Sequence, residues 1–190
     1  MDDDFKSLLT SEFAPIKSLT ETQLSLLEQH YQILCSWNKR MNLTRIRSVR
    51  DAIQFHYCES LFLAEWLPKR SLRIADVGSG AGFPGIPIAV LRSDCNVALI
   101  ESHQRKAAFL REAARQLPNV NVVPRRAEEC AGGYDWMVSR AVNVEQLREL
   151  TLAPSLAILI GAEDADRFRI IKVPWGERRV LAFHVEQEPA

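Results

Sequence analysis

Three glycines at alternating positions, Gly78, Gly80 and Gly82, are the residues whose type and spacing point most directly to a bound ligand. A short apolar run precedes them and apolar residues at helical spacing follow them, so the segment predicts a strand, a loop and a helix that begins near Phe83. Glycine can adopt positive φ and, lacking a Cβ, lets a ligand lie against the backbone. We therefore predict a ligand-binding loop whose glycine amides are free to face the ligand.

Several classes of nucleotide-like ligand bind to loops of this kind, and they differ in the other residues that they require. A triphosphate loop of the Walker type needs Gly-Lys-Ser/Thr, but no lysine occurs between Lys69 and Lys106. This class is therefore excluded. A dinucleotide loop needs Gly-x-Gly-x-x-Gly, which Gly80, Gly82 and Gly85 satisfy in spacing. A dinucleotide ligand stays open on spacing alone.

Two acidic residues favour a different ligand. Asp76 opens the order Asp-x-Gly-x-Gly-x-Gly, and Pro84 falls between the last two glycines of the dinucleotide spacing. This pattern resembles the S-adenosylmethionine loop of class I methyltransferases, whose ligand has no pyrophosphate. Glu101 ends the next predicted strand, where Rossmann-like folds place a carboxylate that accepts hydrogen bonds from ribose hydroxyls. The alternative is that Glu101 or Ser102 only caps the following helix.

The elements that must position these residues fall into two parts. Thr20 and Gln23 form a capping-box pattern at the start of a helix over 20–39, and Ser48 can cap a second helix that Pro68 ends. We expect an N-terminal helical segment over 1–68, packed on a core over 69–190 in one compact unit. Strands are predicted near 72–77, 96–101, 120–125, 135–140 and 156–161, and core helices near 84–92, 103–117 and 143–150.

The alternation of strands and helices predicts an α/β fold, a Rossmann-like doubly wound sheet, mostly parallel, of the class I methyltransferase type. The C-terminal edge of this sheet is expected to be abbreviated. Too few residues separate the strand at 156–161 from the strand-like segment 169–173 for a standard helical crossover. The turn Pro174-Trp175-Gly176 then predicts an antiparallel hairpin with 180–185.

Composition and charge limit the function classes. The 190 residues carry a formal net charge of zero, so any nucleic acid must be bound by a local patch, and we expect a monomer. Because no apolar run approaches about 18 residues and the chain begins Met-Asp-Asp-Asp, we expect no membrane span, no signal peptide and a cytoplasmic protein. The four cysteines form no Cys-x-x-Cys pair and no histidines cluster beside them, so no metal site is expected.

Four motifs together resemble one protein family. They are Trp37-Asn38-Lys39-x-x-Asn42-Leu43-Thr44, His56-x-x-Glu59-Ser60, Asp-Val-Gly-Ser-Gly-x-Gly-Phe-Pro-Gly-Ile-Pro and Val138-Ser139-Arg140-Ala141. Over residues 24–162 the chain is similar to the GidB family, also called RsmG, the methyltransferases of small-subunit ribosomal RNA. The resemblance implies an enzyme that moves a methyl group from S-adenosylmethionine to N7 of a guanine in bacterial 16S ribosomal RNA. Its partner would be that RNA or the small ribosomal subunit.

The resemblance also implies which residues contact the cofactor. Carried over position by position, these are Gly78, Phe83, Ala127, Glu128 and Arg140. Glu128 would meet the adenine amino group, Phe83 would supply an apolar wall, and Arg140 would meet the methionine carboxylate or an RNA phosphate. The chain departs from the family pattern at Phe55, where the family usually has arginine, and at Ile160, where it usually has lysine.

A basic stretch is the candidate RNA-binding surface. Its cations are Lys39, Arg40, Arg45, Arg47 and Arg50, with no acidic residue from Ser36 through Arg50. Trp37 lies within the stretch, and Arg105 and Lys106 could extend it. Cations in such a stretch can neutralise RNA phosphates, whereas the alternative is a solvated face without a partner.

The predicted reaction needs no general base, because guanine N7 carries a lone pair and no proton. The sequence accordingly identifies no catalytic side chain, and His56 is expected to be a satisfied helical histidine facing Glu59 or Ser60. Three other functions remain open. They are methylation of a small molecule, dinucleotide-dependent oxidoreduction, and a non-enzymatic role in RNA binding or cell division with a vestigial loop.

Overall fold

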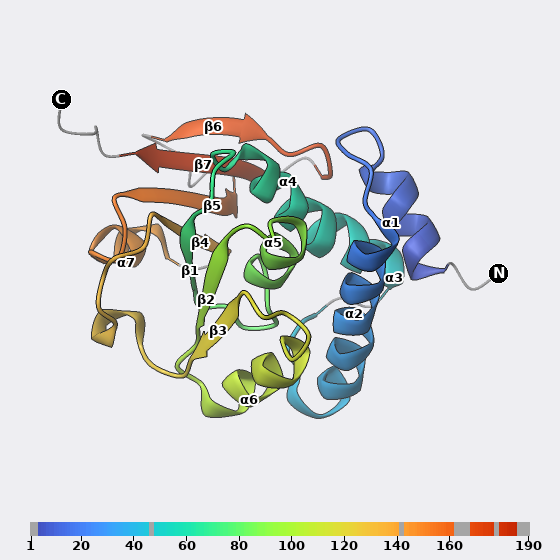
Figure 1. Cartoon of the computed structure of the whole chain (residues 1–190), viewed down its shortest axis with the longest axis horizontal. Helices are drawn as coiled ribbons and strands as arrows, with labels where there is room; N and C mark the ends of the chain where they lie inside the picture. The colour runs from blue at the N-terminus through green and yellow to red at the C-terminus, as the bar shows by residue number, and fades with distance from the viewer. Residues whose placement is uncertain (1–3, 46–47, 141–142, 162–167, 177–178, 186–190) are drawn as a thin grey trace.

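A seven-stranded sheet forms the centre of the protein, seen in a computed structural model that describes residues 4–45, 48–140, 143–161, 168–176 and 179–185 (Figure 1). The strand order is β3-β2-β1-β4-β5-β7-β6. The first five strands are parallel, and β7 runs antiparallel between β5 and β6. The strands are β1 Arg73–Val77, β2 Asn96–Ile100, β3 Val120–Val123, β4 Trp136–Arg140, β5 Ser155–Gly161, β6 Arg169–Lys172 and β7 Arg179–Val185. The predicted doubly wound, mostly parallel sheet is confirmed.

Helices cover the two faces of the sheet unequally. One large apolar core joins α1, α2, α4, α5 and α6 to one face, and a smaller core joins α7 to the other. In β5, Ala157 and Leu159 belong to the large core, whereas Leu156, Ile158 and Ile160 belong to the small one, as the alternation of side chains along a strand requires. The helices are α1 Phe5–Phe13, α2 Glu21–Met41, α3 Val49–Ala52, α4 Glu59–Trp66, α5 Gly85–Leu91, α6 Gln104–Ala113 and α7 Val144–Arg148.

The N-terminal helices follow the predicted pattern with one interruption. Thr20 and Gln23 form the predicted capping box at the start of α2. Ser48 caps α3, but the helix to Pro68 is not continuous, because the π-helix η1, Ile53–Cys58, separates α3 from α4. A π-helical turn is rare and frequently occurs at functional sites. Its presence re-aims the side chains of η1 relative to those of α4.

The ends of the helices and strands around the sheet differ from the predicted ones by a few residues. The helix after the glycine loop begins at Gly85, with Pro84 as its N-cap, and not at Phe83. The C-terminal hairpin is confirmed, because β6 pairs with β7 in antiparallel register, Lys172 opposite Val180. The connection that precedes β6 lies in 162–167, outside the described residues. No helix in the described part of the chain is long and apolar enough to cross a membrane.

Candidate functional site

The predicted site residues gather at the carboxyl ends of the parallel strands. The glycine loop joins β1 to α5, Glu101 follows β2, and Arg140 ends β4. Strands β1, β2 and β4 are neighbours in the sheet, so these three features share one edge. Open α/β sheets bind ligands at this edge.

The glycine amides are not free, contrary to the prediction. Gly78 N–H donates to the carbonyl of Ile100 at 2.9 Å, Gly80 N–H to Glu101 Oε2 at 3.0 Å, and Gly82 N–H to the carbonyl of Ser79 at 2.7 Å. The reason is that the loop folds onto itself and onto the end of β2. What requires glycine is the backbone conformation, since φ is 71°, 53° and 87° at the three positions.

Asp76 ties the helix after the loop to the strand before it. Gly85 N–H donates to Asp76 Oδ2 at 3.0 Å, and a Cβ on Gly85 would lie 2.5 Å from the same oxygen. The third glycine of the dinucleotide spacing therefore allows close packing of α5 on β1. Asp76 is fully buried and its Oδ1 has no hydrogen-bond partner. Burial, together with the negative charge of Glu101, raises the pKa of Asp76 to about 7.

Glu101 holds the loop from the β2 side. Its Oε2 accepts from Gly80 N–H and its Oε1 accepts from His103 N–H at 2.8 Å, and the residue is only 7% exposed. The N-cap of α6 is His103, so the alternative in which Glu101 or Ser102 caps this helix is wrong. Each carboxylate oxygen can accept more than one hydrogen bond. Glu101 is thus fixed by two backbone donors and keeps acceptor capacity for a ligand.

Arg140 is held by residues from the N-terminal helices. Its Nη2 lies 3.2 Å from Glu59 Oε2, and its Nη1 donates to His56 Nδ1. His56 Nδ1 also lies 3.0 Å from the carbonyl oxygen of Phe55, and its Nε2 lies 2.9 Å from Thr44 Oγ1. His56 is a satisfied histidine as predicted, but its side chain faces Thr44 and Arg140 and not Glu59 or Ser60.

Asn38 completes this network from α2. Its Nδ2 donates to the Thr44 carbonyl at 3.0 Å, and its Oδ1 accepts from Thr44 N–H at 2.9 Å. The motif around Trp37, the motif around His56 and the end of β4 are far apart in the sequence, yet they meet in one contact chain. Sequence reasoning did not assign a role to Asn38, Thr44 or Glu59, and their occurrence in short motifs was the available signal.

Phe83 lies inside an aromatic cluster. Its ring centroid is 4.7 Å from that of His56, 5.0 Å from Tyr57 and 5.1 Å from His30, and the residue is 6% exposed. Most of the predicted apolar wall therefore packs inward beneath the loop. The side chain supports the loop through packing, and little of its surface remains for a ligand.

Ala127 and Glu128 follow β3, which is the neighbour of β2 in the sheet. They lie on the 3₁₀-helix η2, Ala127–Glu129, after β3, and Glu128 is exposed. Together with Gln146 and Glu149 they line a cavity of about 340 Å³ beside α7, and no described residue of the glycine loop lines it. The two residues predicted to contact the cofactor, Ala127 and Glu128, therefore line the cavity beside α7.

The predicted RNA-binding cations within the described residues lie on α2, α3 and α6 and in the loop after α2. Lys39 and Arg40 are exposed on the last turn of α2, and Arg45 is exposed after it. Arg105 is exposed and Lys106 half-buried in the first turn of α6. Arg50 Nη1 pairs with Glu12 Oε1 at 3.3 Å, and Arg47 lies outside the described residues.

Trp37 fastens α2 to α6 instead of standing free beside the cations. Its Nε1–H donates to Glu112 Oε2 at 3.0 Å, and its ring meets Phe109 edge-on at a centroid distance of 5.9 Å. The side chain is thus committed to packing between the two helices. This contact holds the C-terminal part of α2 against the C-terminal half of α6, whereas Arg105 and Lys106 lie on the first turn of α6.

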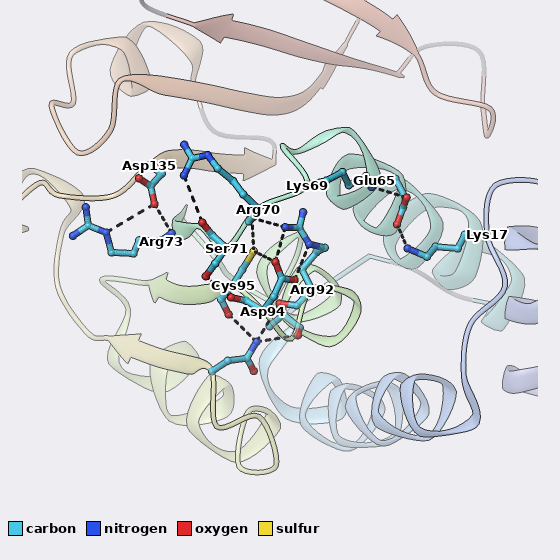
Figure 2. A network of polar contacts seen from close by, with 12 residues as sticks. Lys17, Glu65, Lys69, Arg70, Ser71, Arg73, Arg92, Asp94, Cys95 and Asp135 are labelled. Atoms are coloured by element: carbon cyan, nitrogen blue, oxygen red, sulfur yellow. Dashed lines mark hydrogen bonds and ion pairs between the residues drawn. The ribbon is translucent and has the colours of Figure 1, made fainter. Parts of the chain in front are cut away.

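A second polar network lies at the opposite ends of the strands (Figure 2). Arg92 Nη2 pairs with Asp94 at 2.8 Å and donates to the Arg70 carbonyl at 2.7 Å, and Arg73 N–H donates to Asp135 at 2.6 Å. These residues precede or begin β1, β2 and β4. The network fixes the loops at the amino ends of the strands and leaves the carboxyl ends for the ligand.

Comparisons with known proteins agree with this geometry. A family model described as GidB, rRNA small subunit methyltransferase G, matches residues 23–156. The chain is 42% identical over 129 residues to ribosomal RNA small subunit methyltransferase G of Chromobacterium violaceum, covering 66% of this chain and 61% of that protein. The protein of that name from Dichelobacter nodosus is 39% identical over 151 residues, covering 75% of this chain and 71% of the relative. The chain therefore spans about three-fifths of the length of the first of these relatives.

The fold has solved counterparts as well. A SAM-dependent methyltransferase from Aquifex aeolicus superposes with a TM-score of 0.53 at 17% identity, covering 70% of this chain and 91% of that one. This likeness confirms the predicted class I methyltransferase fold. Because the family model matches well over half of the chain, the chain belongs to the rRNA small subunit methyltransferase G (GidB) family.

Proposed function

We propose that this protein transfers the methyl group of S-adenosylmethionine to N7 of a guanine in bacterial 16S ribosomal RNA. The observation that carries the proposal is the glycine loop locked against Glu101 at the ligand-binding edge of the sheet, in a chain that matches the GidB model over residues 23–156. We further propose that it acts as a cytoplasmic monomer, since a chain of 190 residues in a family that modifies ribosomal RNA suits this state.

The residues at this edge fit the cofactor chemically. The ribose diol would donate to the Glu101 carboxylate, which two backbone amides already orient. The backbone of Gly78, Gly80 and Gly82 and the edge of Phe83 would lie beside the ligand, and Arg140 would face its carboxylate. Ala127 and Glu128 would receive the adenine. When bound, the cofactor supplies a methyl group activated by a positively charged sulfur.

The protein's own contribution is to hold and orient the two reactants. Since N7 has no proton, no side chain has to remove one, and the engagement of both His56 ring nitrogens by Arg140 and Thr44 agrees with this. Positioning of reactants can lower a barrier by roughly 7–11 kcal/mol where the geometry is good. The buried side chains of Arg140 and Glu101, each held by partners within the protein, suit such a rigid site.

RNA would approach over the ends of α2 and α6. Within the described residues, Lys39, Arg40 and Arg105 form no ion pair, so their charges are available to phosphates. Arg50 would have to exchange its contact with Glu12 for one with RNA. The proposed RNA-binding set is Lys39, Arg40, Arg45, Arg47, Arg50, Arg105 and Lys106.

One experiment separates this function from the alternatives. Purified protein is titrated calorimetrically with S-adenosylmethionine and with NAD, and methyl transfer is then assayed on small subunits and on a small-molecule panel. We expect the protein to bind S-adenosylmethionine but not NAD, and to transfer the methyl group to the small subunit. Binding of NAD alone would favour an oxidoreductase, although a β7 antiparallel to its neighbours speaks against the dinucleotide fold. Binding without any transfer would favour the non-enzymatic role.

A further inference from the structure

His30 connects the N-terminal helices to the glycine loop. It lies in the middle of α2 and is 1% exposed. Its Nε2 is 3.0 Å from the carbonyl oxygen of Ala81, and its Nδ1 is 2.9 Å from the hydroxyl of Tyr57. Ala81 lies between Gly80 and Gly82, so the N-terminal helix α2 contacts the centre of the glycine loop.

The two hydrogen bonds of His30 allow one proton arrangement. The Ala81 carbonyl only accepts, so Nε2 carries the proton, and Nδ1 then accepts the hydroxyl proton of Tyr57. Burial lowers the pKa of His30 to about 4, so the imidazole is neutral at physiological pH. Tyr57 comes from η1 and is fully buried. The hydroxyl of Tyr57 thus fixes the tautomer that binds the loop.

This contact pins one peptide unit of the loop. The carbonyl of Ala81 accepts from His30, while the N–H of the same peptide, on Gly82, donates to the Ser79 carbonyl at 2.7 Å. A Cβ on Gly82 would lie 3.0 Å from His30 Nε2, so the imidazole also fills the space on that side. On the other side, Glu101 accepts from Gly80 N–H. The loop is therefore held between α2 and the end of β2.

We propose that His30 and Tyr57 are positioning residues that clamp the glycine loop in its cofactor-binding conformation. The inference rests on the proposed function, because it concerns the affinity for S-adenosylmethionine. It assigns to the N-terminal helices a part in binding the methyl donor, in addition to the proposed contact with RNA. The tautomer set by Tyr57 orients Nε2–H, Nε2–H orients the Ala81–Gly82 peptide, and that peptide sets the course of the loop past Glu101.

The test compares three variants with the wild type. Tyr57→Phe keeps the ring and removes the hydroxyl, His30→Leu leaves the Ala81 carbonyl without its donor, and His30→Gln offers a side-chain N–H that can replace it. Tyr31→Phe is the matched control, because it removes a hydroxyl from the residue next to His30 in α2, whose ring stacks on Phe5 and meets Tyr57 edge-on. Affinity for S-adenosylmethionine is measured by calorimetry, KM and kcat by methyl transfer, and loop opening by hydrogen exchange at the Gly82 amide.

We expect Tyr57→Phe to weaken cofactor affinity by about three- to tenfold and His30→Leu by about tenfold or more, from the usual worth of a hydrogen bond and of a buried unpaired acceptor. In both variants the KM for the cofactor should rise, while kcat and the KM for RNA should stay nearly unchanged. His30→Gln should recover part of the affinity, and Tyr31→Phe should match the wild type. Folded Tyr57→Phe and His30→Leu proteins with wild-type affinity would overturn the clamp.

Failure of the proposed function gives a different result. In that case the wild type itself does not bind S-adenosylmethionine. Hydrogen exchange then decides the clamp by itself, since it needs no ligand. Faster exchange at Gly82 in Tyr57→Phe than in Tyr31→Phe supports the clamp, and equal exchange in the two variants overturns it.

Discussion

The guanidinium of Arg140 and the carboxylate of Glu59 lie 3.2 Å apart, and their side chains are only 9% and 1% exposed. Arg140 ends the central strand β4, and Glu59 begins α4 directly after the π-helix. The pair therefore joins the ligand-binding edge of the sheet to the N-terminal helices. His56, on the same π-helix, holds the other guanidinium nitrogen, so the interruption of the predicted helix places both partners of Arg140.

Removing one member of this pair should be costly. Glu59→Ala leaves the Arg140 charge buried without its carboxylate, and breaking a buried pair in this way costs about 3–5 kcal/mol of unfolding free energy. The control is Glu65→Ala on the same helix, whose partners Lys17 and Lys69 are 44% and 60% exposed, so that the expected cost is below about 1 kcal/mol. Urea denaturation of both variants measures the difference, and equal costs would contradict a stabilising role for the buried pair.

Glu101→Gln tests the proposed ribose contact. The amide oxygen of glutamine can replace one of the two carboxylate acceptors, but its NH₂ group faces a backbone donor and cannot accept from a hydroxyl. We expect about a tenfold or larger loss of affinity for S-adenosylmethionine, measured by calorimetry, since hydrogen bonds to charged groups are worth about 1.5–3 kcal/mol. Glu112→Gln, which keeps an acceptor for Trp37, serves as the control and should bind like the wild type.

Asp76 should make stability fall as pH rises. Its pKa is about 7 in the folded protein against 3.8 for an ordinary aspartate in the unfolded chain, so the folded state binds the extra proton between these two values. The stabilisation is complete below about pH 4 and is lost as pH rises through about 7, by at most about 4 kcal/mol. Asp76→Asn removes this dependence. The free energy of unfolding is measured by chemical denaturation at pH 5 and pH 8. The variant should gain stability relative to the wild type between pH 5 and pH 8, whereas a constant difference would refute the titration of the buried carboxyl.

The proposed RNA surface predicts a salt-dependent loss of affinity. The double variant Lys39→Gln, Arg40→Gln removes two exposed cations at the C-terminal end of α2. If both contact phosphates, affinity for 16S ribosomal RNA falls for all sequences and the slope of log affinity against log salt decreases by about 2. Arg73→Gln, which removes an exposed cation at the opposite ends of the strands, should leave the slope unchanged. An unchanged slope in the double variant would show that Lys39 and Arg40 on α2 do not contact RNA phosphates.

Fold and loop position could be predicted from the sequence because they depend on local signals. The spacing of Gly78, Gly80 and Gly82, the capping box at Thr20 and the short tail before β6 each act over a few residues. Hydrophobic alternation then determines which face of each strand is buried. For the same reason Glu101 could be placed, since it ends a strand next to the loop in the sheet.

What could not be predicted depends on contacts between distant segments. The glycine amides are satisfied by β2, which no local pattern indicates. Trp37 packs on α6, 75 residues from its acceptor Glu112, and Arg140 meets His56 across 84 residues. The break at the π-helix has no signal in hydrophobic spacing, because His56 and Glu59 fit a regular helix equally well. Such contacts require the three-dimensional arrangement.

The central claim is methylation of guanine N7 in small-subunit ribosomal RNA, and base mapping in a deletion strain tests it most directly. We predict that deleting the gene removes one N7-methylguanosine from 16S ribosomal RNA and that the wild-type gene restores it. A copy with Gly80→Asp should not restore it, because the new carboxylate lies next to Glu101, which accepts from the Gly80 amide, and the two negative charges repel each other. An unchanged set of N7-methylguanosines in the deletion strain would contradict the proposed function.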